Sequence, residues 1–307
     1  MNEQIRFIKV RGAAMEVWEM GEGAPVVILT GMNSPIWEWH AVVQALSRNH
    51  RVILFHRPGL GKSEIGDHTR RTGAIAEELN ELLPLLGIHE PIMLIGHSYG
   101  GLCAQHFARW YPSKIKALLL VDSTSVNLHR LDDLDLPVMD ADNDAAWLET
   151  CLSYSEKTRE ELKVVIPPGW DPGLPTPLLE KLSDFQWNPL MYAAMHSEVT
   201  WWKEDAWIIK NGPRFPVIPL VVIARDKKSI IRQEDGLPEW EKRIFEALWE
   251  KLMYEQTRLM DGSRFIVAEG SGHAVHLDRP DVVVEAFHHL TKKVQENEGA
   301  GGSCPIH

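Results

Sequence analysis

The chain is poor in cysteine, in positive charge and in long apolar runs. Three cysteines among 307 residues cannot form a disulfide framework. Lysine and arginine number 32 against 43 acidic residues, and the net charge of −11 disfavours binding to nucleic acid or to an anionic membrane. No run approaches the apolar length of a membrane span, and the opening MNEQIRFIKVRG lacks the apolar region of a signal peptide. We therefore expect a cytoplasmic protein with no nucleic-acid partner and no membrane span.

Short apolar runs alternate with segments of helical periodicity along much of the sequence. Most runs lack a clean polar alternation, which is typical of parallel strands covered on both faces. The first two lie close enough to form an antiparallel hairpin, and helices are expected over residues 75–86, interrupted by Pro84, and over residues 281–294. This order predicts an α/β sheet with right-handed crossovers. The expected strands are residues 6–10, 15–19, 26–30, 52–56, 92–95, 117–121, 219–224 and 265–268.

The segment from about residue 125 to residue 213 breaks this alternation. Its first part is acidic, and its later part holds half of the 12 tryptophans. We interpret residues 125–213 as an inserted helical cap on a core formed by residues 1–124 and 214–296. The tryptophans are expected either to form the core of the cap or to line an apolar pocket beneath it. The Gly-rich tail, residues 297–307, is expected to be disordered.

Two Gly-rich turns follow apolar runs, and the first resembles a phosphate-binding loop. HRPGLGKSE contains Gly61, Lys62 and Ser63, the end of a G-x-x-x-x-G-K-[ST] motif. The position of the first glycine is occupied by His56, however, and a polar stretch follows instead of the helix that cradles phosphates. We therefore reject nucleotide binding for this turn.

The second turn lies in PIMLIGHSYGGLCAQHFARWYP, where a serine stands between glycines. A strand and a helix are joined there by the tight turn around Ser98, which needs neighbours without side chains and displays its central residue. The G-x-S-x-G spacing matches a nucleophile elbow. The backbone N–H of Tyr99, at the start of the helix, can help to stabilise an oxyanion. We predict that Ser98 is a nucleophile.

A serine hydroxyl needs a general base at neutral pH. Of the 14 histidines, His273 has a suitable setting, in a Gly-flanked loop between a strand and a helix within RFIVAEGSGHAVHLDRPD. That places it at the carboxyl end of its strand, as Ser98 is at the end of its own. His276 has apolar neighbours and is expected to pack, and the side chain of His97 is expected to leave the turn in another direction.

These motifs together resemble the α/β-hydrolase family, in the subgroup with a helical cap after the sixth strand. The resemblance covers about residues 5–295. VVILTGMNSPIWEWH is similar to the family's oxyanion loop, with Thr30 in place of the usual histidine, and implies that the N–H of Met32 joins that of Tyr99 in an oxyanion hole. FHRPGLGKS and GSGHAVHLDRPD are similar to two further family motifs. The resemblance implies an α/β-hydrolase fold: a mostly parallel eight-stranded sheet flanked by helices, with the cap inserted.

The resemblance allows two positions for the acid that orients the histidine. The commoner one follows the strand at residues 219–224, where VVIARDKKS offers Asp226, although earlier than usual and beside lysines. The other follows the strand after the elbow helix, where LLLVDST offers Asp122 beside the strand that carries Ser98. We favour Asp122 and keep Asp226 as the alternative.

The resemblance and the motifs together predict a serine hydrolase that works through an acyl-enzyme. No H-E-x-x-H, no C-x-x-C pair and no calcium-loop spacing is present, so we expect neither metal nor cofactor. The Trp-rich cap favours a small apolar ester, typical of a carboxylesterase. Thioesters, amides, lactones, carbon–carbon bonds and acyl transfer use the same residues. A ligand receptor with little turnover is the alternative from another class.

Overall fold

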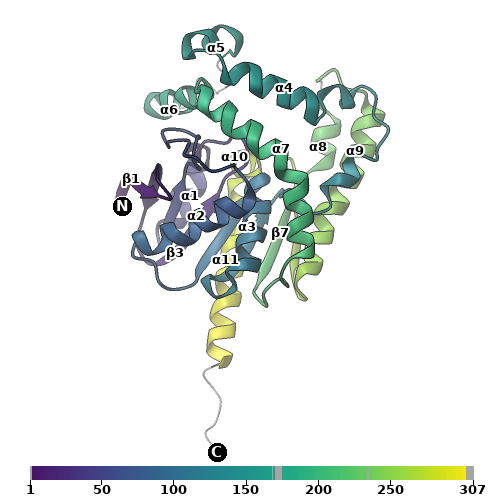
Figure 1. Cartoon of the computed structure of the whole chain (residues 1–307). Coiled ribbons are helices and arrows are strands. Elements are labelled where there is room, and N and C mark those ends of the chain that lie inside the picture. Colours follow the sequence, from purple (N-terminus) through teal and green to yellow (C-terminus); the bar gives the residue numbers. More distant parts are fainter. Residues whose placement is uncertain (1, 168, 170–174, 234, 302–307) are drawn as a thin grey trace, which may run out of the picture.

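The computed structural model describes residues 2–167, 169, 175–233 and 235–301. An eight-stranded sheet with the order β1-β2-β4-β3-β5-β6-β7-β8 forms its centre (Figure 1). β1 and β2 form an antiparallel hairpin, β2 is also antiparallel to β4, and the other neighbours are parallel. The strands are β1 (Glu3–Val10), β2 (Ala13–Met20), β3 (Ala24–Leu29), β4 (His50–Phe55), β5 (Ile92–His97), β6 (Ile115–Val121), β7 (Leu220–Arg225) and β8 (Arg264–Ala268).

All eight expected strands are present, and the hairpin expectation is confirmed. The observed strands differ from the expected ranges mainly at their ends, because the hydrogen-bonded ladder continues over polar residues that carry no apolar signal. β5 reaches His97 and β7 reaches Arg225 in this way. β5 therefore ends directly before Ser98, and β7 ends directly before Asp226.

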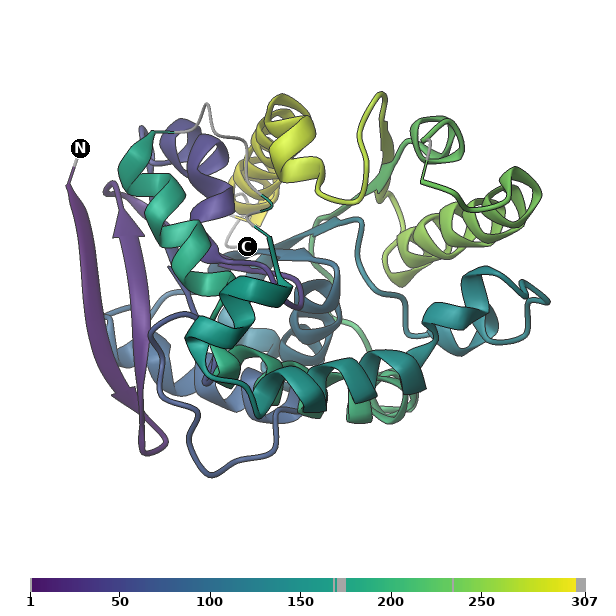
Figure 2. The same ribbon diagram turned by 90° about the horizontal axis from the view of Figure 1, so that it is seen from above.

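Helices cover both faces of the sheet, and each face has its own apolar core. One core lies under α2 (Thr72–Leu85), α3 (Tyr99–Trp110) and α9 (Glu239–Gln256). The other lies under α1 (His40–Leu46) and α11 (Pro280–Gly301). The short elements are η1 (Ile36–Trp39), η2 (Pro112–Lys114), α8 (Lys227–Ile231), η5 (Thr257–Leu259) and α10 (Val275–Asp278). Figure 2 shows the β1–β2 hairpin at one side of the molecule and α9 at the other.

Two expectations about helices are wrong. Pro84 does not interrupt α2: it lies in the last turn, where the helix is about to end and the lost N–H matters least. Residues 297–301 of the expected disordered tail are helical, because α11 continues to Gly301. Extending an existing helix adds one hydrogen bond for each residue fixed and is far easier than starting one. Residues 302–307 of that tail lie outside the described residues.

A helical insert lies between β6 and β7, where the cap was expected. It contains η3 (Leu128–Leu131), η4 (Met139–Asp142), α4 (Asp144–Ser155), α5 (Arg159–Val165), α6 (Thr176–Gln186) and α7 (Pro189–Asn211). Figure 1 shows α4, α5 and α6 above the sheet, while α7 runs from that layer down beside α3. An apolar cluster that includes Cys151, Phe185 and Met191 joins these helices. Trp170, one of the tryptophans assigned to the cap, lies outside the described residues.

No helix in the described part of the chain is both long enough and apolar enough to cross a bilayer.

Candidate active site

The turn between β5 and α3 holds Ser98 in a strained backbone conformation. Its φ of 52° and ψ of −127° lie outside the regions that residues with a side chain prefer, at a cost of about 1–3 kcal/mol. The glycines on either side make the turn possible. A Cβ on Gly100 would overlap the carbonyl oxygen of Leu29, and a Cβ on Gly96 would lie 2.6 Å from the Cα of Gly101. The G-x-S-x-G spacing is thus a packing requirement of this turn.

Neighbouring strands hold the strained turn in place. The N–H of Ser98 donates to Val121 O at 3.2 Å, and the N–H of Thr124 donates to Ser98 O at 2.9 Å. Both partners belong to the end of β6 or to the residues that follow it. Among the residues that the structure describes, the Ser98 hydroxyl has no hydrogen-bond acceptor, and Ser98 lines a cavity. The turn therefore leaves the Ser98 hydroxyl free at the cavity.

Asp122 and His273 lie at the same edge of the sheet as Ser98. Asp122 follows β6, the neighbour of β5, and His273 follows β8, so both come from the carboxyl ends of parallel strands. His273 Nδ1 is 2.6 Å from Asp122 Oδ2, and the imidazole lines the same cavity as Ser98. The Asp122 carboxylate is an acceptor, which fixes the proton on Nδ1 and leaves Nε2 free to accept one. The sequence predicted these three residues, and the structure brings them together.

The Asp122 carboxylate is fully buried and is held by four donors. Besides His273, Arg225 Nη1 reaches Oδ2 at 3.2 Å, while the Arg225 N–H and Trp249 Nε1 donate to Oδ1 at 3.1 and 2.9 Å. Burial alone would raise the pKa of Asp122, but the Arg225 charge and these hydrogen bonds outweigh burial and lower the pKa well below its ordinary value. Asp122 is therefore ionised at neutral pH.

Arg225 and Trp249 were not predicted from the sequence. Arg225 is paired a second time, with Glu246, and its Cζ lies 4.3 Å from the centroid of the Trp249 ring. Its Nη1 also lies 3.5 Å from His273 Nδ1, so two donors converge on one carboxylate oxygen. The available signal was the position of Arg225 at the end of an apolar run, and that alone does not indicate a contact with Asp122.

Asp226, the alternative acid, makes other contacts. Its side chain caps α8 by accepting from Lys228 N at 2.9 Å, and its Oδ2 accepts from Gly270 N at 3.0 Å. Oδ1 thus caps α8, and Oδ2 ties the end of β7 to the loop after β8. Among the described contacts, none joins Asp226 to His273.

Two more histidines pack beside His273. His97 leaves the elbow toward the interior, as expected, and its Nε2 lies 3.0 Å from the carbonyl oxygen of His273. Burial lowers the pKa of His97 well below its ordinary value, so the neutral ring donates this hydrogen bond. His276 is buried and stacks on Trp39 with ring centroids 4.3 Å apart. The packing expected of His276 is confirmed.

Glu38 contacts His276 without forming an ion pair at neutral pH or below. His276 Nε2 is 3.2 Å from Glu38 Oε2, which also accepts from the Ser34 hydroxyl at 2.6 Å. Burial raises the pKa of Glu38 to about 7 and lowers that of His276 to about 3. Between about pH 3 and pH 7 the contact therefore joins a protonated carboxyl group and a neutral imidazole.

Glu38 is expected to make the protein less stable as the pH rises through neutrality. Its folded pKa of about 7 exceeds the ordinary value of 4.5, so its contribution is complete below pH 4.5 and is lost as the pH rises through 7. The slope is about 1.4 kcal/mol per pH unit between these limits. The E38Q variant lacks this titration, so its free energy of unfolding should rise relative to that of the wild type from pH 5 to pH 7.

Urea unfolding at several pH values measures this difference. Replacing the exposed Glu285 by glutamine is the matched control and should leave the pH dependence as it is in the wild type. Parallel stability curves for E38Q and the wild type between pH 5 and pH 7 would contradict a protonated Glu38.

The loop after β3 passes close to Ser98. A Cβ on Gly31 would lie 3.1 Å from the Cβ of Ser98, so a side chain there would crowd the serine. In the part of the chain that the structure describes, no protein acceptor is found for the N–H of Met32 or of Tyr99. Thr30 Oγ1, at the position of the family's usual histidine, is buried without a partner among the described residues. The backbone of this loop, not its side chains, is what approaches the serine.

A cavity of about 650 Å³ lies over Ser98 and His273, between the sheet edge and the insert. Most of its wall is apolar, and Trp147 and Trp202 of the insert contribute to it. Some tryptophans of the expected cap thus line a pocket, whereas Trp207 is 64% exposed. The apolar lining is Leu128, Leu131, Leu136, Met139, Ala145, Trp147, Trp202, Leu237, Phe245 and Trp249.

The acidic run reaches one side of this cavity. Asp132, Asp140 and Asp144 are among its lining residues. Lys203 of α7 pairs with Asp132 at 2.8 Å and with Asp144 at 2.7 Å, so one of these three negative charges is compensated.

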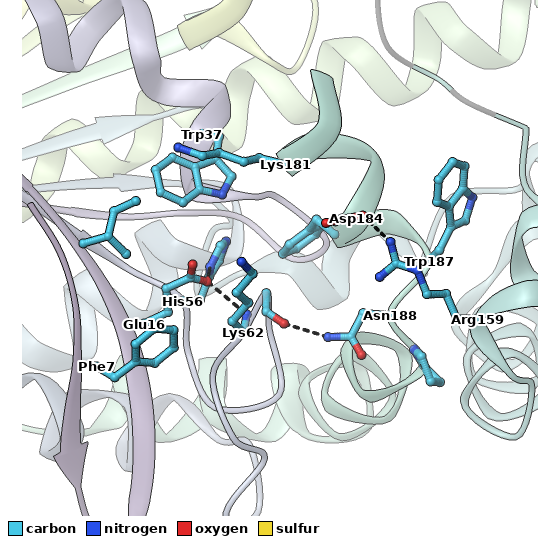
Figure 3. Close-up of a pocket in the computed structure, with 14 residues that line it drawn as sticks. Phe7, Glu16, Trp37, His56, Lys62, Arg159, Lys181, Asp184, Trp187 and Asn188 are labelled. Atoms are coloured by element: carbon cyan, nitrogen blue, oxygen red, sulfur yellow. Dashed lines mark hydrogen bonds and ion pairs between the residues drawn. The ribbon is translucent and has the colours of Figure 1, made fainter. Parts of the chain in front are cut away.

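A second, smaller hollow of about 270 Å³ lies beside the β1–β2 hairpin (Figure 3). Its wall combines aromatic rings with the charged ends of Lys62 and Lys181, and the Lys181 ammonium lies 4.0 Å from the Trp37 ring centroid. His56 also lines this hollow. Its Nδ1 lies 2.7 Å from Glu16 Oε2, so this ring nitrogen is already paired with a carboxylate. No nucleophile with a free base is present among the described lining residues, so this hollow lacks the means for the chemistry available over Ser98.

The rejected phosphate-binding motif has a structural role. Ser63 Oγ donates to His56 O at 2.6 Å, and the next helix begins only at Thr72. Over the described residues, no cluster of histidine, cysteine or acidic side chains is suited to hold a metal ion.

Comparison with known proteins shows what this chain resembles. A pimeloyl-[acyl-carrier protein] methyl ester esterase of Aeromonas hydrophila is 34% identical over 114 residues, which are 36% of this chain and 42% of that protein. The chain spans less than half of the length of the first curated relatives that it matches.

Solved structures agree over nearly the whole chain, at identities that establish the fold alone. The epoxide hydrolase CorEH superposes with a TM-score of 0.65 at 18% identity, covering 95% of this chain and 100% of that one. A serine hydrolase involved in carbazole degradation gives a TM-score of 0.64 at 17% identity, covering 95% and 99%. Residues 24–280 match the alpha/beta hydrolase fold family. The chain belongs to the alpha/beta hydrolase fold family.

Proposed function

We propose that this hydrolase cleaves an ester, or a related acyl bond, of a small and largely apolar substrate through Ser98, His273 and Asp122. The observation that carries the proposal is the 2.6 Å contact between His273 Nδ1 and Asp122 Oδ2 at the cavity that Ser98 lines. Nucleophile, base and orienting acid then stand in the order that acyl transfer by a serine requires.

In the first half of the reaction, Ser98 Oγ attacks the acyl carbon and its proton moves to His273 Nε2. Asp122 keeps the imidazole in the required tautomer and stabilises the imidazolium that forms. The N–H groups of Met32 and Tyr99 bind the oxyanion, each donor contributing roughly 3 kcal/mol. The tetrahedral intermediate then collapses, and the leaving alcohol takes the proton from His273.

In the second half, water hydrolyses the acyl-enzyme. His273 Nε2 removes a proton from the water as the hydroxide forms a bond to the acyl carbon. The same two N–H groups hold the second oxyanion. Collapse breaks the bond to Ser98 Oγ, which regains its proton, and releases the acid.

The cavity supports an apolar acyl or alcohol group. The apolar part of its wall is mostly leucine and aromatic side chains, and its volume of about 650 Å³ suits a small or medium ester. The acidic side of the cavity disfavours an anionic substrate, because Lys203 compensates only part of its negative charge.

Covalent labelling tests the proposal directly. A fluorophosphonate probe should add once to the folded wild type, and peptide mapping should place the adduct on Ser98. Turnover of a p-nitrophenyl ester series should fall in step with labelling, because both need the same nucleophile. Heat-denatured protein, which lacks the assembled site, serves as the control.

An adduct at another residue would overturn the assigned nucleophile. Saturable binding of an ester, with neither label nor turnover, would instead favour the alternative of a receptor built on this fold.

A further inference from the structure

Arg57 is a buried cation that the proposed reaction does not use. It follows β4, and its side chain is only 1% exposed. Its guanidinium donates to two backbone carbonyls of the loop after β3, from Nη1 to Thr30 O at 2.7 Å and from Nη2 to Gly31 O at 3.0 Å. A planar fork with two directed bonds fixes the orientation of both peptide groups.

The second of these carbonyls shares a peptide group with a proposed oxyanion donor. Gly31 C=O and Met32 N–H belong to one planar trans peptide, in which the two bonds point in opposite directions. When Arg57 holds the carbonyl on one side, the N–H is held on the other. The same bond resists rotation of this peptide, which would turn the N–H of Met32 away.

The charge on Arg57 also affects the strength of that donor. A hydrogen bond to a carbonyl polarises the whole amide and makes its N–H a better donor, and a charged partner does so more strongly. The guanidinium carbon also lies 5.5 Å from the centroid of the Tyr99 ring. Arg57 thus holds the peptide group that carries the N–H of Met32 and also lies over the ring of Tyr99.

Arg57 is itself held by the insert. Glu198 of α7 accepts from Nε at 2.7 Å and from Nη2 at 3.1 Å, and its side chain is also 1% exposed. The bidentate pair orients the plane of the guanidinium, and without Glu198 the buried charge would have no carboxylate partner among the described residues. The position of α7 is therefore coupled to that of the loop after β3.

We propose that Arg57 is a positioning residue that holds the Gly31–Met32 peptide with its N–H toward the substrate oxyanion, and that Glu198 of the insert holds Arg57 in that orientation. This inference rests on the proposed function, because it concerns a donor for the same reaction. Neither residue touches the substrate.

Two conservative variants test the inference. R57K keeps the charge but cannot hold two carbonyls in one plane. E198Q keeps an acceptor oxygen for Arg57 and removes the charge, so it is expected to fold. Each should lower kcat for a p-nitrophenyl ester by roughly 10- to 100-fold, up to the effect of losing one oxyanion donor, with little change in KM.

An inhibitor constant separates positioning from stability. A trifluoromethyl ketone forms a tetrahedral adduct with an active serine, and its oxyanion needs the same donors. In R57K and E198Q, its Ki should rise by the same factor by which kcat falls. The matched control is E19Q, which removes the carboxylate charge that pairs with Arg6 and Arg51 outside the site. E19Q should lose thermal stability but keep the wild-type kcat and Ki.

The outcomes distinguish this inference from the proposed function. Wild-type kcat and Ki in folded R57K and E198Q would overturn the role of Arg57 while leaving the serine hydrolase intact. An equal loss of kcat in E19Q would show that the effect follows from lower stability, and it would overturn the role of Arg57 as well. Absence of turnover and of inhibitor binding in the wild type would count against the proposed function instead. If R57K does not fold, E198Q decides alone.

Discussion

Replacing Ser98 by alanine is expected to lower kcat for ester hydrolysis on the order of 10⁶-fold, the loss seen when the nucleophile of a triad is removed. The reason is that His273 and the two N–H groups then have no hydroxyl to act on. Alanine accepts the φ of 52° no more readily than serine does, so stability should change little. Initial rates with a p-nitrophenyl ester measure the effect, and thermal unfolding checks the fold.

A second serine near the site provides a matched control. Ser125 is buried after β6 but is absent from the cavity wall, and its hydroxyl accepts from Asn127 N at 3.1 Å. S125A should therefore keep kcat near the wild-type value. Activity that survives in S98A, or that is lost equally in S125A, would contradict the assignment of the nucleophile.

Replacing Asp122 by asparagine is expected to lower kcat by about 10⁴-fold. The asparagine side chain donates where the carboxylate accepts, so it favours the imidazole tautomer with the proton on Nε2. That proton stands where the Ser98 proton has to go. Labelling by a fluorophosphonate should slow in parallel, because it depends on the same base.

The choice between the two acids is decided by the matching change at Asp226. Asparagine is a good helix cap, so D226N should keep the cap of α8 and most of the activity. A large loss in D226N together with normal rates in D122N would exchange the roles of these two residues.

The sheet could be predicted from the sequence because its signal is local. Apolar runs of strand length separated by helical periodicity identified all eight strands, and the hairpin followed from the short distance between the first two. The errors concern places where a local signal is weak. Pro84 was read as an interruption without knowing that α2 ends beside it, and Gly residues near position 300 were read as disorder although α11 was already formed before them.

The candidate site could be predicted in part for the same reason. Ser98 and His273 stand in turns whose glycines carry a recognisable spacing. The acid was left open because both aspartates follow strands, and only the direction of each side chain separates them. Contacts between segments that are far apart in the sequence leave no local sequence pattern. Glu198 lies 141 positions from Arg57, and Trp249 lies 127 positions from Asp122.

The insert, which supplies part of the cavity wall, is separate in the chain from the proposed reacting groups. Met32, Ser98, Tyr99 and Asp122 precede it and His273 follows it, while Trp147 of α4 supplies part of the cavity wall. Among the described contacts, α7 is the helix of the insert that reaches the loop after β3 through Arg57, by way of Glu198. Chimeras that exchange α4 to α6 and retain α7 can therefore sample new substrate preferences without redesign of the reacting groups. The architecture makes this enzyme a natural scaffold for segment-swap libraries.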